Sequence, residues 1–290
     1  MPRYIQKSEL LFCQCRFDRK PARVTDFDFS ENEVQRYARH IVLKEVGGTG
    51  QMKLKRGRVL IVGAGGLGSP LAMYLAAAGV GTIGIVDADT VELSNLQRQI
   101  AHGMGDIGTA KVDSAKATMR DMNPNVTVNA HNTRLDATNV MDLIADYDVI
   151  ADGSDNFDTR FLLNDACYLA GKTLVSGAAL RFDGQVSTFK AHLGAPHPCY
   201  RCIYHAPPPE DAIPSCAQGG VLGSVVGMIG GMQATEVLKE LMGIGDGLSG
   251  QLLIVDALSA SYRKIKVPRD PGCPICSENA TIKDLSIHEH

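Results

Sequence analysis

The chain has 290 residues, of which 44% are hydrophobic and 21% charged, and its formal net charge is −3. This balance excludes an intrinsically disordered chain, and the small net charge gives no reason to expect general affinity for nucleic acids or membrane surfaces. No apolar run is long enough to span a bilayer, and residues 1–29 lack the apolar core of a signal peptide, so we expect a cytoplasmic protein.

The predicted elements begin after residues 1–29, which show no sustained period and are interpreted as an N-terminal extension outside the fold. Ser30 precedes Glu33 by three residues, a capping box that predicts a helix through Val42. Strands are then expected at 59–65, 82–87, 126–130, 147–152 and 173–179, with helices at 69–78, 111–122, 139–145 and 156–170. This alternation predicts an α/β fold with a Rossmann-like, doubly wound, mostly parallel sheet.

The character of the sequence changes after residue 179. Residues 181–190 predict a hairpin, and 196–220 form a Pro-rich connection that is too long for a routine loop. A Gly- and Met-rich helix is expected at 221–242, and further antiparallel strands at 251–257 and 260–267. We therefore expect one continuous domain at 30–277, with a nucleotide-binding half at about 58–179, a second part at about 180–277 and a C-terminal tail at 278–290.

A glycine-rich motif lies between the first of these strands and the helix after it, with glycines at Gly63, Gly65, Gly66 and Gly68. At such a junction, free backbone N–H groups and the positive end of the helix can bind a phosphate. Asp87 ends the next strand, where a carboxylate can accept hydrogen bonds from a ribose. Both features fit NAD and ATP equally well, and the alternative is a glycine-rich turn that binds nothing.

The residues that follow distinguish the two nucleotides. Segment 89–99 is polar and carries Arg98, and Lys111 begins a predicted helix. Two cations beside a phosphate loop suit a triphosphate whose pyrophosphate must leave, whereas a nicotinamide needs a largely apolar slot. The alternative for each cation is a solvated surface charge. Asp155 follows the fourth strand and is either a Mg²⁺ ligand or the N-cap of the next helix, and both interpretations stay open.

Two C-x-x-C pairs lie far apart in the sequence, at Cys199, Cys202, Cys273 and Cys276. Four thiolates predict a closed tetrahedral zinc site of structural type, and the alternative is a pair of redox dithiols. Cys216 stands just before a predicted helix and is either a reactive thiolate or a small buried hydrophobe. Cys167 is expected to be a buried hydrophobe, and no role is assigned to Cys13 and Cys15.

The motifs together resemble those of a known family. GAGGLG, IVDADTVELSNLQRQ, the lysine of TAKVDSAK, GSDN, VSGAA, CYRC, CAQGGVLG and PGCPIC occur in the order seen in the MoeB/ThiF/HesA family, the bacterial relatives of ubiquitin-activating enzymes. The resemblance runs from about Ser30 to Ser277. It implies an adenylyltransferase that uses ATP and Mg²⁺, acts as a homodimer, and adenylates the C-terminal glycine of a small ubiquitin-fold sulfur-carrier protein bound by the second part of the domain.

The resemblance also implies site residues. Arg98, Lys111 and Asp155 become catalytic residues, and Arg39 is expected to enter the ATP site of the partner subunit. Cys216 aligns with a cysteine that some members use in sulfur transfer. The nucleotide-binding residues predicted in this way are Gly63, Gly65, Gly66, Gly68, Asp87, Asp89, Ser94, Asn95, Leu96, Gln97, Arg98, Lys111, Asp155 and Asn156.

The identity of the carrier is less constrained. The molybdopterin-synthase small subunit is our first expectation, and the alternative is the thiamine sulfur carrier, with Cys216 in sulfur transfer. The eukaryotic relatives carry a rhodanese domain after the second cysteine pair, whereas this chain ends within a few residues of it. We therefore expect the sulfur donor on another chain. From a different class, an NAD-dependent oxidoreductase remains an alternative, although nothing after Asp87 supports it.

Overall fold

The computed structural model describes residues 28–209 and 219–289, so the predictions for the N-terminal extension up to residue 27, including Cys13 and Cys15, lie outside the described residues, as does Cys216. Helix α1 (Glu31–Ile41) begins after Ser30. The Ser30 hydroxyl accepts a hydrogen bond from the Glu33 N–H at 3.3 Å, and the Glu33 carboxylate accepts one from the Ser30 N–H at 2.9 Å. The predicted capping box is confirmed.

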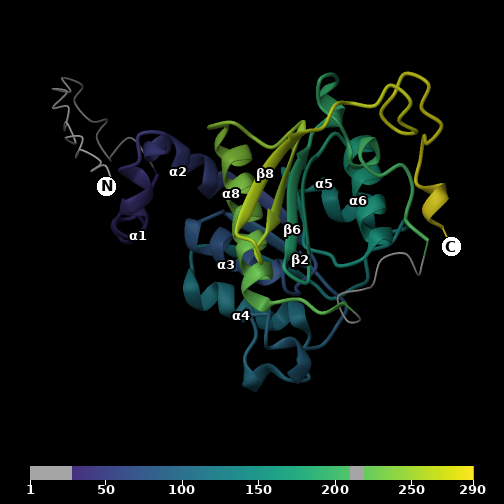
Figure 1. The fold of residues 1–290 in the computed structure, drawn as a ribbon. Helices are drawn as coiled ribbons and strands as arrows, with labels where there is room; N and C mark the ends of the chain where they lie inside the picture. The colour runs from purple at the N-terminus through teal and green to yellow at the C-terminus, as the bar shows by residue number, and fades with distance from the viewer. Residues whose placement is uncertain (1–27, 210–218, 290) are drawn as a thin grey trace, which may run out of the picture.

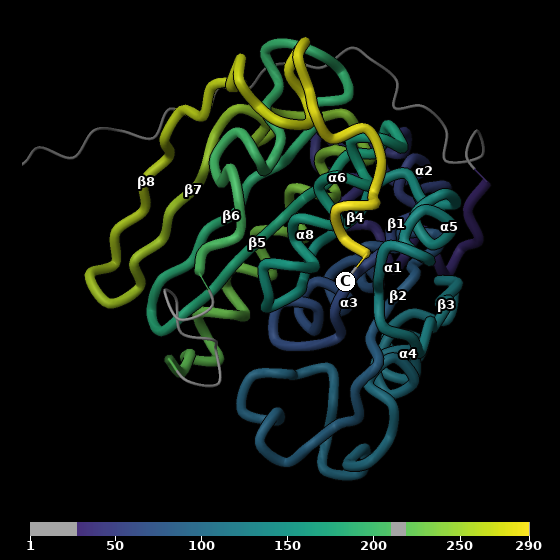
Figure 2. The backbone as a smooth tube through the Cα atoms, turned by 90° about the vertical axis from the view of Figure 1, so that its right-hand side faces the viewer, coloured from purple at the N-terminus to yellow at the C-terminus, as the bar shows by residue number. Residues whose placement is uncertain are grey.

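One sheet of eight strands runs through the molecule, in the order β3-β2-β1-β4-β5-β6-β7-β8 (Figures 1 and 2). The strands β3, β2, β1, β4 and β5 are parallel to one another, and β6, β7 and β8 continue the sheet in antiparallel pairings. The sequence-based fold class is confirmed. The strands are β1 (Arg58–Val62), β2 (Thr82–Val86), β3 (Thr127–His131), β4 (Val149–Asp152), β5 (Thr173–Leu180), β6 (Asp183–Phe189), β7 (Gln251–Asp256) and β8 (Ser261–Lys266).

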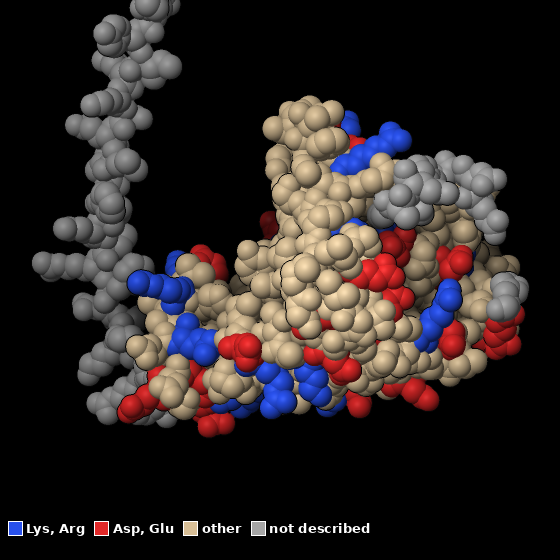
Figure 3. Space-filling model, turned by 90° about the horizontal axis from the view of Figure 1, so that it is seen from below, with Lys and Arg blue, Asp and Glu red and all other residues tan. Residues whose placement is uncertain are grey.

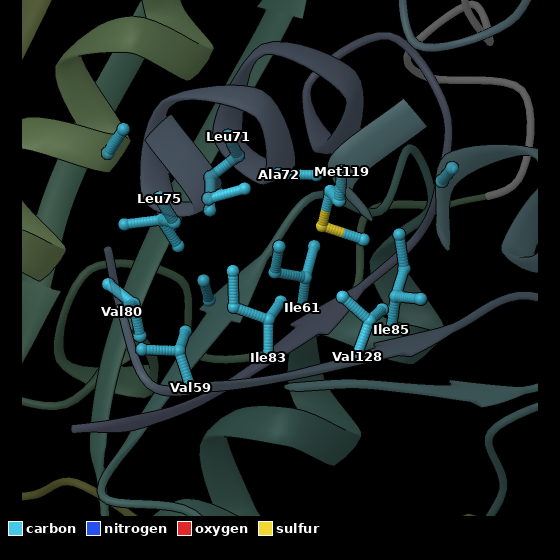
Figure 4. Close-up of a cluster of buried hydrophobic side chains, with 14 of the residues drawn as sticks. Val59, Ile61, Leu71, Ala72, Leu75, Val80, Ile83, Ile85, Met119 and Val128 are labelled. Atoms are coloured by element: carbon cyan, nitrogen blue, oxygen red, sulfur yellow. The ribbon is translucent and has the colours of Figure 1, made fainter. Parts of the chain in front are cut away.

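Helices cover both faces of the parallel strands. Helices α3 (Gly68–Ala78), α4 (Lys111–Met122) and α8 (Gly223–Met242) share a core with one face, and α5 (Val140–Ala145) and α6 (Phe157–Leu169) share a core with the other. In the first core, residues of β1, β2 and β3 such as Ile61, Ile83 and Val128 point toward Leu71 and Met119 of the helices (Figure 4). Because both of their faces are buried, the inner parallel strands β1, β2 and β4 are mostly hydrophobic, whereas the edge strand β3 is partly polar.

Several element boundaries in the structure differ from the predicted ones. The first strand ends at Val62, so the glycine motif lies entirely outside the sheet. The expected hairpin within 181–190 is wrong in its first strand: β5 pairs with β6, and the chain turns at Arg181 and Phe182. Arg181 has a φ of 55°, which lets the reversal occur in so few residues. Helix α8 begins at Gly223 because residue 221 forms a bridge to Arg181.

Helix α2 (Gly47–Arg56) was not predicted. Three of its first four residues after Val46 are glycines, which have low helix propensity. Packing decides the outcome, because Leu54 is fully buried in a small core with Ala78 and Met242. The Gln51 side chain is also buried and donates to the Ala78 carbonyl at 2.8 Å. Tertiary contacts with α3 and α8 thus overcome the weak local preference.

Within residues 28–209 and 219–289, no helix is both long and apolar enough to cross a membrane.

Candidate active site

The glycine loop lies where β1 ends, beside the ends of β2 and β4. The Gly63 N–H donates to Val86 at the end of β2 at 2.8 Å, and the Gly153 N–H, after β4, donates to Val62 at 2.8 Å. Gly63 has a φ of 93°, and a Cβ there would lie 2.8 Å from the Gly153 carbonyl oxygen. A Cβ at Gly68 would lie only 1.8 Å from the Gly63 carbonyl oxygen. These two positions therefore require glycine, and α3 begins directly at the loop.

Asp87 holds the loop from the side of β2. Its Oδ2 accepts from the Ala64 N–H at 2.7 Å, and its Oδ1 accepts from the Asp89 N–H at 2.9 Å. Both carboxylate oxygens keep further lone pairs for a ligand hydroxyl, because a carboxylate can accept about four hydrogen bonds. The residue predicted to bind a ribose therefore also supports the glycine loop.

The two predicted cations come together at this loop. Lys111 begins α4, is 6% exposed, and its Nζ lies 2.7 Å from Asp89 Oδ2. The surface-charge alternative is therefore wrong for Lys111. Arg98 is half-buried and donates to the Ser94 carbonyl at 3.1 Å. The first turn of α8 packs closely against the backbone of Gln97 and Arg98, since a Cβ at Gly223 would lie 2.3 Å from the Gln97 carbonyl oxygen.

Asp155 lies in the turn between β4 and α6. The N-cap of α6 is Asn156, whose Oδ1 accepts from the Thr159 N–H at 2.9 Å. The capping alternative for Asp155 is therefore wrong. Its side chain is exposed, so its carboxylate is accessible at the carboxyl ends of the strands, where open α/β sheets bind ligands.

A cavity of about 410 Å³ brings these residues together at the carboxyl ends of the parallel strands. Its volume is that of a small-molecule site, and its walls are mainly polar and charged around the glycine loop, with an apolar end. Leu67, Ala179, Val221 and Val226 line the apolar end. Of the predicted residues, the cavity is lined by Gly63, Gly65, Gly66, Asp87, Asp89, Arg98, Lys111, Asp155 and Asn156.

Some predicted residues do not line this cavity in the part of the chain that the structure describes. Gly68 serves close packing, and Ser94, Asn95, Leu96 and Gln97 lie in the turn before Arg98. The Asn95 side chain accepts from the Glu92 N–H at 3.2 Å and so stabilises that turn. The role of these residues as nucleotide ligands stays a prediction.

Arg39 is also remote from the cavity of its own chain. It is exposed on α1, whose Tyr37 packs against Gly79 after α3 and whose Arg36 donates to Met122 at the end of α4. The cavity lies at the other ends of α3 and α4. An 11-residue helix such as α3 is about 16 Å long, so α1 and the cavity are separated by about the length of this helix. The entry of Arg39 into the ATP site of a partner subunit stays a prediction.

Sequence reasoning missed further residues of the cavity wall. Thr133, Arg134 and Leu135 follow β3, and Thr159 and Arg160 lie on α6. The first three could have been found, since the carboxyl ends of parallel strands meet at one edge of the sheet. Arg160 carried no motif, although it is 8% exposed and donates to the Ser154 carbonyl at 3.0 Å.

The four cysteines of the two C-x-x-C pairs form one cluster. Their Sγ atoms lie within 4.8 Å of one another, with Cys199 and Cys273 at 3.4 Å and Cys202 and Cys276 at 3.5 Å. Hydrogen bonds among the four thiols lower the pKa of Cys202 and Cys273 and raise the pKa of Cys199 and Cys276, so the four sulfurs interact as one group. Four convergent sulfur ligands with little solvent access fit a closed metal site and disfavour two separate redox dithiols.

Comparison with known proteins identifies the family. The family model described as ThiF family matches residues 37–275. The chain belongs to the ThiF family. It is 46% identical over 263 residues to the sulfur carrier protein adenylyltransferase of Thermus thermophilus. The aligned region covers 90% of this chain and 97% of that protein. It is 50% identical over 261 residues to the adenylyltransferase and sulfurtransferase MOCS3 of Sus scrofa, again over 90% of this chain but only 57% of the relative.

Solved structures share the ThiF-family fold. E. coli MccB with ATP superposes with a TM-score of 0.72 at 21% identity and covers 83% of this chain and 74% of MccB. PaaA superposes with a TM-score of 0.71 at 24% identity, over 83% of this chain and 76% of PaaA. The family membership predicted from the sequence is confirmed, and the predicted adenylyltransferase activity agrees with the names of both relatives.

A buried ionic cluster joins α6 of this ThiF-family chain to the cysteine cluster and to the C-terminal segment. Asp165 is fully buried, and the Arg201 guanidinium donates to both of its carboxylate oxygens, at 2.8 and 2.7 Å. His288 Nε2 lies 2.9 Å from Asp165 Oδ2. Although burial opposes its charge, hydrogen bonds from His288 and Arg201 hold the pKa of the Asp165 carboxyl below its usual value. Cys167, nearby on α6, is buried as predicted, and burial raises the pKa of its thiol.

Replacement of Asp165 by asparagine is expected to cost about 3 kcal/mol of unfolding free energy at neutral pH, because it leaves the Arg201 charge buried without its carboxylate. The folded-state pKa of Asp165 is lowered, so its stabilising effect is present above the ordinary carboxyl pKa of 3.8 and disappears as the pH falls through the lower folded-state value. Urea unfolding at several pH values measures this. The difference in unfolding free energy between the wild type and Asp165→Asn should shrink on acidification. The control Asp158→Asn, at an exposed position of α6, should change the unfolding free energy little.

Proposed function

We propose that the chain is an ATP-dependent adenylyltransferase that activates the C-terminal glycine carboxylate of a small ubiquitin-fold sulfur-carrier protein. The molybdopterin-synthase small subunit is the proposed carrier. The observation that carries the proposal is the meeting of the glycine loop with Arg98, Lys111 and Asp155 in one cavity. The names of the Thermus and MOCS3 relatives support the same activity.

The cavity offers groups that suit the phosphates and the ribose of ATP and a Mg²⁺ ion. Free N–H groups of the glycine loop and the first turn of α3 suit phosphate oxygens, and the Asp87 carboxylate suits the ribose hydroxyls. Arg98 and Lys111 supply positive charge for the triphosphate. Asp155 has an accessible carboxylate that would hold Mg²⁺, and this ion would neutralise phosphate charge.

The proposed reaction needs no general base, because a carboxylate is ionised at neutral pH. One carboxylate oxygen of the carrier forms a bond to the α-phosphorus of ATP, and the bond from that phosphorus to the bridging oxygen of the β-phosphate breaks. Pyrophosphate leaves with the bonding electrons, and the product is an acyl-adenylate. The chain contributes alignment and stabilisation of the leaving charge, chiefly through Arg98 and Lys111.

The carrier is expected to reach the cavity from its apolar end. Leu67, Ala179 and Val226 line this end, so a flexible glycine-containing tail can pass there without burying unpaired charges. The expectation that the connection between Tyr204 and Gly220 covers this tail falls mostly on residues 210–218, which lie outside the described residues. Sulfur transfer through Cys216 stays a prediction, as does a sulfur donor on another chain.

We also propose a homodimer and a structural zinc ion. The segment 93–107 forms the lower end of the molecule in Figures 1 and 2, and the view from below shows a broad central area with few charged side chains (Figure 3). Leu93, Ile100, Met104 and Ile107 of this segment are exposed, as expected for an interface. A partner seated there would also account for an Arg39 that is remote from the cavity of its own chain. The four cysteines are the proposed zinc ligands.

The experiment that tests the function is ATP–pyrophosphate exchange with each candidate carrier in turn. We expect exchange only when a carrier with an intact C-terminal glycine is present, with the fastest exchange for the molybdopterin-synthase small subunit. A carrier lacking its last glycine is the matched control. Faster exchange with the thiamine sulfur carrier would reassign the carrier. No exchange with any carrier, together with reduction of NAD in the presence of an oxidisable substrate, would overturn the proposed class.

A further inference from the structure

A buried histidine lies behind the glycine loop and outside the cavity wall. His102 is 7% exposed, and both of its ring nitrogens have partners. Its Nε2 lies 2.9 Å from the Ala64 carbonyl oxygen in the loop, and its Nδ1 lies 2.8 Å from the Ser114 hydroxyl on α4. His102 therefore links the loop to the helix that carries Lys111.

These contacts form part of a circuit of hydrogen bonds that the backbone of α4 closes. The Ala64 N–H donates to Asp87, and Asp87 accepts in turn from the Asp89 N–H. Asp89 Oδ2 binds Lys111 Nζ at 2.7 Å. Lys111 and Ser114 lie one turn apart on α4, so Ser114 and His102 lead back to Ala64. The circuit fixes the glycine loop, the end of β2 and the first turn of α4 relative to one another.

The partners of His102 define its hydrogen-bonding state. A carbonyl oxygen can only accept, so Nε2 carries the proton and donates to Ala64, and Nδ1 of the neutral ring accepts from Ser114. Burial lowers the pKa of His102, and the charge of Lys111 acts in the same direction. The hydrogen bond to Ala64 and the charges of Asp106 and Asp87 act in the opposite direction, without cancelling the decrease. The imidazole is therefore neutral at physiological pH.

The Ala64 carbonyl belongs to the same peptide group as the Gly65 N–H. The C=O and N–H groups of a trans peptide point in opposite directions, so the bond from His102 to the Ala64 carbonyl also fixes where the Gly65 N–H points. Gly65 lines the cavity. With the Ala64 N–H held by Asp87, the peptides on both sides of Ala64 are fixed before any ligand arrives.

We propose that His102 is a positioning residue that orients the Gly65 peptide, and through Ser114 the start of α4, for binding of the ATP triphosphate. The inference rests on the proposed function only in naming ATP as the ligand. It assigns the effect to the Nε2 contact with Ala64. It therefore makes a prediction that differs from that of a histidine that merely fills the core.

Two substitutions separate the two ring contacts. The amide of Gln reaches about as far as Nε2 of histidine and can donate to Ala64, whereas the amide of Asn reaches only as far as Nδ1 and can bond Ser114. Thr118→Val is the matched control, because the Thr118 hydroxyl bonds the Ala101 carbonyl at 2.7 Å but does not contact the loop. The measurement is the Kd of Mg-ATP by calorimetry without any carrier, together with the thermal midpoint of each variant.

We expect His102→Asn to weaken ATP binding about tenfold, as for a lost buried hydrogen bond, and His102→Gln to stay within about threefold of the wild type. Thr118→Val should bind ATP like the wild type even if it lowers the thermal midpoint. Equal Kd values for the Asn and Gln variants, or weaker binding by Gln than by Asn, would overturn the inference. A wild-type chain that binds ATP but exchanges with no carrier defeats only the proposed function. One that does not bind ATP defeats both.

Discussion

Replacement of Arg98 by alanine is expected to reduce carrier-dependent ATP–pyrophosphate exchange by about 10²–10³-fold, the usual cost of removing a group that stabilises transition-state charge. The chain should stay folded, because Arg98 is half-buried at the cavity and, within residues 28–209 and 219–289, its side chain makes one hydrogen bond, to the carbonyl of Ser94 in its own turn. Exchange rates measure the loss of activity, and circular dichroism measures whether the variant is folded. An Arg98→Lys variant should recover part of the rate, since it keeps the charge but loses the planar, forked set of donors.

The control for Arg98 is Arg120→Ala. Arg120 is exposed in the last turn of α4, at the end of the helix that lies away from Lys111 and the cavity. Its removal changes the net charge of the chain as much as the removal of Arg98 does, so a general electrostatic effect would appear in both variants. Near-normal exchange by a folded Arg98→Ala protein would remove this residue from the catalytic assignment.

The second large effect is expected at the cysteine cluster. Replacement of Cys273 by serine, or removal of the metal by a strong chelator, should lower the thermal midpoint by about 10 °C or more, since the binding free energy of a structural metal adds to the folding free energy. None of the four cysteines of the cluster lines the cavity. Activity should therefore be lost only as the protein unfolds.

Cys167 provides the matched control for the metal site. It is a buried cysteine of the same chain outside the cluster, so Cys167→Ala should cost only about 1 kcal/mol and leave the metal content unchanged. Metal analysis should find about one zinc ion per chain in the wild type and none in the Cys273→Ser variant. Loss of exchange activity by a metal-free chain that is still folded would contradict a purely structural role.

The parts of the site that could be predicted are those fixed by local rules. The glycine loop follows from the backbone conformation at Gly63 and the close approach at Gly68, and both leave a pattern in the sequence. Strand and helix alternation likewise places Asp87 and Asp155 at one edge of the sheet. The cysteine spacing predicted a cluster that the structure brings together over a long stretch of chain.

The parts that were missed depend on tertiary contacts. Helix α2 forms because Leu54 packs in a buried core, in spite of the glycines at the start of the helix. His102 has no sequence motif, since its importance arises only where α4 comes next to the loop. The Asn156 cap could not be distinguished from one at Asp155, because both residue types are good caps and lie next to each other.

The distance along the chain between the two cysteine pairs has a consequence for biosynthesis. Cys199 and Cys273 are 74 residues apart, and α8, β7 and β8 lie between them. On the ribosome, the first pair emerges well before the second and can offer an ion only two thiolates, too few for tight binding. For the proposed metal site, complete coordination becomes possible only when the last strands of the sheet have left the ribosome, so we expect metal binding only after this whole region has been synthesised.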